Sequence, residues 1–125
     1  FFQGVHNHLL PGGLCLTQTL NYETPAMKRP RVRVERAELQ EGELAAIKRF
    51  LPGTDHTRLS IDYLGVTSGA LFEAAEAFTL QHWTARQLSE VALHTGLQVK
   101  DCFGGYDRRP FREDAPDIVL VTQKP

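Results

Sequence analysis

The segment from Asp117 to Gln123 constrains the fold of this chain more than any other. Its central residues, Ile118 to Val121, are apolar without interruption, and no polar residue alternates with them. A strand of this kind needs cover on both of its faces, which a sheet between two layers of other elements provides. A small open sheet leaves one face in water. The run therefore favours a three-layer α/β domain.

Turn and capping residues predict two further strands and a helix in the same chain. Leu14 to Leu20 is a mostly apolar stretch after Pro11-Gly12-Gly13, which is typical of a strand inside a sheet. Thr84-Ala-Arg-Gln87 fits a capping box, so we expect a helix to begin there. Gly96 suits the left-handed residue that ends such a helix, and Gln98 to Phe103 predicts the next strand.

The middle of the chain predicts a meander of antiparallel strands. Its connectors contain Gly42, Pro52-Gly53 and Ser68-Gly69, which are turn residues at hairpin spacing. The expected strands are Arg31 to Leu39, Glu43 to Leu51, Thr57 to Val66 and Ala70 to Gln81.

One part of this meander has a second interpretation. Residues 41–51 also fit an amphipathic helix, because Leu44, Ile47 and Leu51 fall on one helical face. The strand that follows alternates cleanly at Leu59, Ile61 and Tyr63 and needs a hairpin partner upstream. We therefore favour a strand.

Composition excludes some classes of protein. The 125 residues have the size of about one domain, and 14 basic against 15 acidic residues leave a formal net charge of -1. No global field draws such a chain to nucleic acid or an anionic membrane, and no apolar run approaches the roughly 18 residues of a membrane span. Cys15 and Cys102 form no disulfide framework. We expect reduced core thiols in a cytoplasmic protein.

The first four residues, Phe1-Phe2-Gln3-Gly4, resemble the remnant of an engineered protease site, and we set them aside from the fold. The native sequence is then expected to start near Val5. Because His6 to Gly13 reads as the end of a helix and a turn before a strand, we expect the chain to be truncated within a domain.

Several motifs in order resemble a known family. Leu9-Leu10-Pro11-Gly12-Gly13 precedes a strand, a β-rich excursion follows, and then come "HWTARQLSEVALHTGLQVKDCFGGYDRRPF" and a closing "DIVLVTQKP". This order resembles the C-terminal half of class I S-adenosylmethionine-dependent methyltransferases of the small-molecule type. The family has an L-x-P-G-G turn before its fifth strand, a capped helix before its sixth, a G-x-Y/F-D-x-x-P-F loop, and an antiparallel seventh strand.

The resemblance implies an α/β fold: strands five, six and seven of a Rossmann-like methyltransferase with one helix, plus an inserted antiparallel β meander. Its implied parts are residues 5–24 for the fifth-strand unit, 25–83 for the insertion or lid, and 84–125 for the helix and last two strands. Leu14 to Leu20 should then pair antiparallel with Asp117 to Gln123, and the meander should form a separate sheet.

The resemblance also implies that the half that binds S-adenosylmethionine is missing, because its glycine-rich loop and acidic ribose ligand lie before the fifth strand. Gly104-Gly105 follows a strand but opens no helix, and we interpret it as a flexible turn. The fragment alone should neither bind S-adenosylmethionine nor be active. The exposed edge of Leu14 to Leu20 should make it self-associate, most simply as a two-fold dimer.

In resembling proteins the loop after the fifth strand and the β excursion close over a small-molecule acceptor. This nominates seven substrate-binding residues, which are Asn21, Tyr22, Arg31, Arg33, Tyr63, His82 and Trp83. Catalytic residues and any general base stay unassigned. Methyl transfer depends chiefly on orientation of the acceptor. Tyr63 also fits a core position, and Trp83 fits a hydrophobic staple at the start of the helix.

Other interpretations stay open. His6 and His8 could be half of a metal site, but no supporting Cys or acidic residue lies at a suitable spacing. Arg31 and Arg33 share a strand face that could contact an anionic acceptor or RNA, and a solvated edge strand explains them as well. The composition does not favour nucleic acid. The competing class is a non-enzymatic α+β module for ligand binding or dimerisation.

Overall fold

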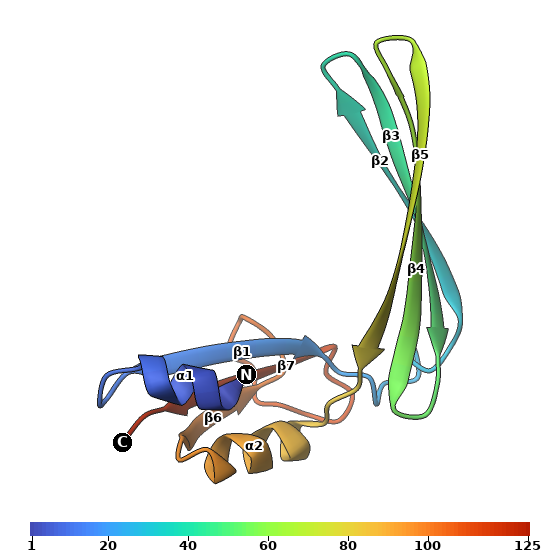
Figure 1. Ribbon diagram of the computed structural model, residues 1–125. Coiled ribbons are helices and arrows are strands. Elements are labelled where there is room, and N and C mark those ends of the chain that lie inside the picture. Colours follow the sequence, from blue (N-terminus) through green and yellow to red (C-terminus); the bar gives the residue numbers. More distant parts are fainter. The chain divides into compact units, whose positions relative to one another are not determined.

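The computed structural model describes residues 1–125, and Figure 1 shows the order of its elements. The chain divides into two compact units, Phe1–Pro25 with Trp83–Pro125, and Ala26–His82. The first unit contains α1 (Phe2–His8), β1 (Leu14–Leu20), α2 (Ala85–His94), β6 (Gln98–Phe103) and β7 (Asp117–Gln123). The second contains β2 (Arg31–Leu39), β3 (Gly42–Pro52), β4 (His56–Thr67) and β5 (Ala70–Gln81). None of the helices has the length and apolar character needed to cross a membrane.

The sheet of the first unit has three strands in the order β1-β7-β6. β7 runs antiparallel to both neighbours, and its register with β1 extends from Leu14 opposite Gln123 to Leu20 opposite Asp117. The predicted pairing of these two segments is therefore confirmed. β1 lies at an edge of this sheet, as the expected exposed edge of Leu14 to Leu20 requires, and not at the sheet centre that its composition alone predicts.

β7 forms the centre of the core, as its continuous apolar run predicts. Ile118 and Leu120 are 0 % exposed and pack with Phe2 of α1 and with Leu88 of α2. Val119 points to the opposite face and is also buried. Because adjacent residues of a strand face opposite sides, this pattern confirms the expectation of cover on both faces.

Helix α1 corrects two expectations. It begins at Phe2, within the segment set aside as a tag remnant, and the Phe2 side chain is only 4 % exposed in the core. The expectation that residues 1–4 lie outside the fold is therefore wrong, because an aromatic side chain that contacts the core contributes to its stability. The end of α1 at His8 confirms the helix end expected before the Pro-Gly-Gly turn, and α1 is a second helix beside the one counted in the expected fold class.

Helix α2 begins with the predicted capping box. The Gln87 backbone N–H donates to the Thr84 hydroxyl at 3.1 Å, and the Thr84 backbone N–H donates to the Gln87 side chain at 3.0 Å. The helix ends at His94, and Gly96 follows with φ of 84°, a conformation that favours glycine. Both helix ends were therefore predicted from local sequence.

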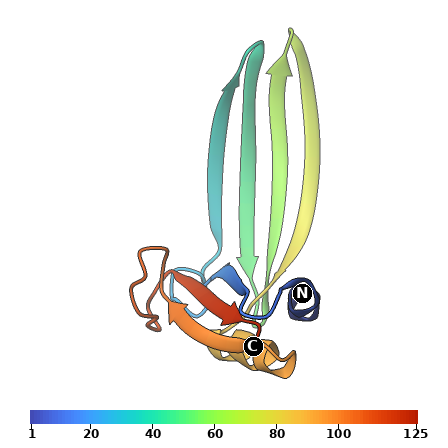
Figure 2. The ribbon, with the colours of Figure 1, turned by 90° about the vertical axis from the view of Figure 1, so that its left-hand side faces the viewer.

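The second unit is a four-stranded antiparallel sheet in the order β2-β3-β4-β5. Figure 2 shows its long strands side by side, with the β2–β3 and β4–β5 turns at the same end. Residues 42–52 pair with β2 and with β4, so they form a strand and the helical alternative is wrong. Gly42 is required in this pairing, because a Cβ there would lie 1.7 Å from the carbonyl oxygen of Val66.

Candidate functional site

Asn21 directly follows β1 and holds the loop before β7. Its Nδ2 donates to the carbonyl oxygens of Glu113, at 2.9 Å, and Ala115, at 2.8 Å, while its Oδ1 accepts from the backbone N–H of Glu23. The residue is 1 % exposed. Both donor hydrogens of the amide are used by the protein itself, so this side chain positions the loop.

Tyr22 and Trp83 are the other sequence candidates in the first unit. Tyr22 is buried, whereas Trp83 is 36 % exposed. Trp83 lines a hollow of about 430 Å³ with residues of α1, β1 and α2, among them Phe2, Thr17 and Leu88. Because residues 1–4 were expected to be a tag remnant, α1 was not expected to line this hollow. The two adjacent phenylalanines were the signal that these residues belong to a core.

Arg31 has the most constrained side chain among the second unit's candidates. Its guanidinium carbon lies 4.3 Å from the centre of the Phe50 ring, on the neighbouring strand β3. The stack holds the guanidinium plane in place. Its Nη1 is buried and has no hydrogen-bond partner in this structure. A buried cationic donor without an acceptor is costly to a protein, and a ligand oxygen would satisfy it.

Arg33 and Tyr63 lie on the same face of the sheet as Arg31. The register places Arg33 opposite Lys48, and Tyr63 opposite Ala46, and residues 31, 33, 46 and 48 share one face. Arg33 is mostly exposed, and its Nη1 lies 4.0 Å from a carboxylate oxygen of Glu35. The predicted common face of the two arginines is confirmed, and the register adds Tyr63 to it.

His82 follows β5 and forms hydrogen bonds with Asp55, just before β4, and with Thr57, in β4. Its Nε2 lies 2.8 Å from the hydroxyl oxygen of Thr57, and its backbone N–H donates to the carbonyl oxygen of Asp55 at 2.8 Å. Thr57 is 0 % exposed. The hydroxyl of Thr57 therefore helps to orient the imidazole.

The carboxylates with a shifted pKa form surface ion pairs. Hydrogen bonds from Lys48, His56 and Arg109 lower the pKa of the carboxyl groups of Glu35, Asp55 and Asp107, respectively. A lowered pKa keeps a carboxylate ionised and makes it a weaker proton acceptor. These three groups therefore do not resemble a general base tuned to neutral pH.

The histidine pair lies in α1, and the glycine pair lies in the turn after β6. His8 Nδ1 lies 2.7 Å from the carbonyl oxygen of Gly4, and no group of three or more His, Cys, Asp and Glu side chains is arranged to hold a metal ion. Gly104 and Gly105 follow β6 in a turn that opens no helix. A Cβ on Gly104 would lie 2.6 Å from the Cβ of Ala115, so this glycine permits close packing.

Comparison with solved structures identifies the fold. A methyltransferase dependent on S-adenosylmethionine from Clostridium acetobutylicum matches 98% of this chain with a TM-score of 0.79 at 14% identity. The sugar N-methyltransferase KedS8 from Streptoalloteichus matches 98% with a TM-score of 0.75, also at 14% identity. CalS10, an amino pentose methyltransferase from Micromonospora echinaspora solved with S-adenosylmethionine bound, matches 99% with a TM-score of 0.70 at 16% identity.

The chain has the fold of part of the S-adenosylmethionine-dependent methyltransferases. It spans about half the length of the solved structures, 49%, 47% and 49% of the three chains, respectively. This coverage agrees with the C-terminal half of a class I methyltransferase, which the sequence motifs resemble. No protein-family model and no curated protein matches the sequence.

Proposed function

We propose that this chain supplies the C-terminal, acceptor-binding half of an S-adenosylmethionine-dependent methyltransferase that acts on a small molecule. The observation that carries the proposal is the match of nearly the whole chain to about half of several such enzymes. The antiparallel insertion of β7 between β1 and β6 supports it, because the resemblance implies this order.

The second unit fits the role of an acceptor-binding insertion. Arg31 presents a buried guanidinium nitrogen without a partner, and the Phe50 ring beneath the guanidinium restricts its motion. Arg33 and Tyr63 extend this face, and Tyr22, His82 and Trp83 remain candidates for further contacts. Because two of the similar structures are sugar methyltransferases, amino sugars are the first class of acceptor to assay.

In the proposed enzyme, S-adenosylmethionine supplies an electrophilic methyl carbon, and the role of this chain is to orient the acceptor toward it. Orientation of two reactants accounts for a large part of the rate of such a transfer. The glycine turn at residues 104–105 opens no helix, whereas a cofactor cradle uses the backbone N–H groups at the start of a helix. We therefore infer that the 125 residues are inactive alone and that the complete protein is needed.

Calorimetry with S-adenosylmethionine tests the proposal. We expect no measurable heat of binding with the 125-residue chain. With the protein as its gene encodes it, we expect micromolar binding, a binding free energy of roughly -8 kcal/mol. Tight 1:1 binding to the chain alone would show that the cofactor site has been misplaced. Absence of binding to the gene-encoded protein would contradict the methyltransferase proposal itself.

Acceptor binding is tested by two arginine variants of the gene-encoded protein. Arg31→Ala should raise the KM of the acceptor at least about tenfold, because a desolvated charged hydrogen bond contributes about 1.5–3 kcal/mol. Arg33→Ala serves as the matched control on the same strand face, and its exposed side chain predicts a smaller change. Equal effects of the two variants would contradict the role given to the buried nitrogen.

A further inference from the structure

A row of four side chains in the second unit combines a cation with an apolar surface. Arg31, Phe50, Leu59 and Phe78 lie directly opposite one another across β2 to β5, and we call this set the Arg31 row. Arg31 is the first residue of β2, so the row lies at the end of the sheet opposite the β2–β3 and β4–β5 turns, which Figure 2 shows together. Phe78 is 46 % exposed, so this end of the row is open to solvent.

The guanidinium of Arg31 is held in place, but its hydrogen-bonding capacity is not satisfied. Its carbon lies 4.3 Å from the centre of the Phe50 ring, which therefore covers one side of the group. Its Nη1 is buried and has no hydrogen-bond partner. An N–H donor that is buried without an acceptor costs free energy, and the planar fork of a guanidinium matches the two oxygens of a carboxylate. The position therefore favours a carboxylate ligand.

The other charges on this face of the sheet leave one positive charge uncompensated. Glu35 accepts a hydrogen bond from Lys48 at 2.6 Å and lies 4.0 Å from Arg33. The register gives the face three cations, Arg31, Arg33 and Lys48, against two carboxylates, Glu35 and Glu76. An excess of one positive charge suits a singly charged carboxylate better than a phosphate group, which carries about -1.5 to -2 at neutral pH.

Apolar side chains continue the row on the far side of Phe50. Leu59 and Phe78 lie one and two strand spacings beyond it, about 5 and 10 Å. Ile61, in the neighbouring row of the same face, is 7 % exposed and extends this apolar floor. A carboxylate bound to Arg31 therefore places a ring attached to it over Leu59 and Phe78, where the ring displaces water from both side chains.

We propose that the Arg31 row binds a small aromatic carboxylic acid, with its carboxylate on Arg31 and its ring on Leu59 and Phe78. The inference deepens the proposed function by naming a class of methyl acceptor, and the identity of the acid as acceptor rests on that proposed function. The binding itself does not. Aromatic acids therefore join amino sugars among the acceptors to assay.

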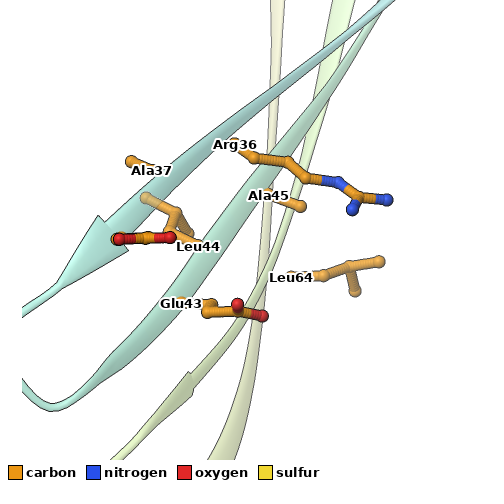
Figure 3. A pocket seen from close by; sticks show the side chains of 7 residues that line it. Arg36, Ala37, Glu43, Leu44, Ala45 and Leu64 are labelled. Atoms are coloured by element: carbon orange, nitrogen blue, oxygen red, sulfur yellow. The ribbon is translucent and has the colours of Figure 1, made fainter.

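The opposite face of the sheet provides a control cation on the same strand. Arg36 lines a hollow of about 790 Å³, and Figure 3 shows its side chain on the same side of the sheet as those of Glu43 and Leu64. Glu38 also lines this hollow, so two carboxylates accompany one cation there. Because this surrounding does not favour an anion, Arg36→Gln is the matched control for Arg31→Gln.

NMR titration of the 125-residue chain with benzoate tests the binding. We expect a dissociation constant on the order of 1 mM, which suits a ligand of this size, with shifts in the methyl signals of Leu59 and none in those of Leu64. Benzamide has the same shape without the charge, and acetate has the charge without the ring. Each should bind at least about tenfold more weakly than benzoate. Inorganic phosphate should also bind more weakly.

Variants assign the binding to the row. Arg31→Gln should raise the dissociation constant of benzoate at least about tenfold, whereas Arg36→Gln should leave it within about twofold. Phe50→Leu keeps the charge but removes the ring beneath the guanidinium, and it should weaken binding about two- to fivefold. The comparison of benzoate with benzamide uses the wild-type chain, so it decides the contribution of the charge even if a variant does not fold.

Several results would overturn the proposal. They are equal binding of benzoate and benzamide, equal effects of the two arginine variants, tighter binding of phosphate, and shifts at Leu64 instead of Leu59. The outcome is also separable from the proposed function, because benzoate binding to the chain requires no S-adenosylmethionine. If the gene-encoded protein binds S-adenosylmethionine and the chain does not bind benzoate, the aromatic-acid site is wrong and the methyltransferase proposal stands. The reverse result contradicts the methyltransferase proposal and supports the site.

Discussion

Replacing Phe2 by alanine tests the inclusion of α1 in the core. Phe2 is 4 % exposed and belongs to the same cluster as Leu88, Ala92 and Leu97. A buried Phe removes about 150 Å² or more of surface from water, and at about 25 cal/mol per Å² this corresponds to roughly 4 kcal/mol. Phe→Ala substitutions in cores cost about 3–5 kcal/mol. We expect a loss in this range from the stability of the first unit.

Urea unfolding followed by tryptophan fluorescence measures this loss. Trp83 is the single tryptophan of the chain and lines the same hollow as Phe2, so its emission reports on the first unit. Leu10→Ala is the matched control, because Leu10 is 79 % exposed and surface substitutions usually change stability by less than about 0.5 kcal/mol. If both variants unfold at the wild-type urea concentration, α1 does not contribute to the core and this reasoning fails.

Two further predictions concern the first unit. Asn21→Ala should cost about 1–3 kcal/mol, because the carbonyls of Glu113 and Ala115 lose their donors, and a urea midpoint equal to that of wild type would contradict it. Burial raises the pKa of the Cys102 thiol, so iodoacetamide should modify it more slowly in the folded chain than in urea at pH 8. Because this pKa is raised on folding, its contribution to stability should be lost as the pH rises above about 9, which the urea midpoint also measures.

Much of the architecture follows from local sequence, and the order of the motifs indicates the fold. Turn glycines separate the strands of the second unit, and Gly69, with φ of 79°, adopts a conformation that other residues avoid. The capping box at Thr84 locates the start of α2 because both of its hydrogen bonds join residues three apart. The pairing of β1 with β7 followed from the resemblance and not from either strand alone.

The candidate site was predicted less completely. Arg31 and Arg33 were expected on one strand face because side chains alternate with a period of two, and the register confirms it. The contact of Arg31 with Phe50 depends on which residues of β2 and β3 lie opposite each other. Asn21 was nominated for substrate, yet its amide binds carbonyls more than 90 residues away in the sequence. No local pattern shows such a partner.

Apart from the start of α1, the sequence by itself determined closely where strands and helices begin and end, since turn, capping and alternation signals act over a few residues. Only the tertiary structure decided the burial of Phe2 and the row that Arg36, Ala45, Leu64 and Glu73 form across β2 to β5. Burial depends on which elements pack together, and the row depends on the combined register of three strand pairs. A shift of one residue in any pairing would move a whole strand's side chains to the other face, so this property belongs to the assembled sheet.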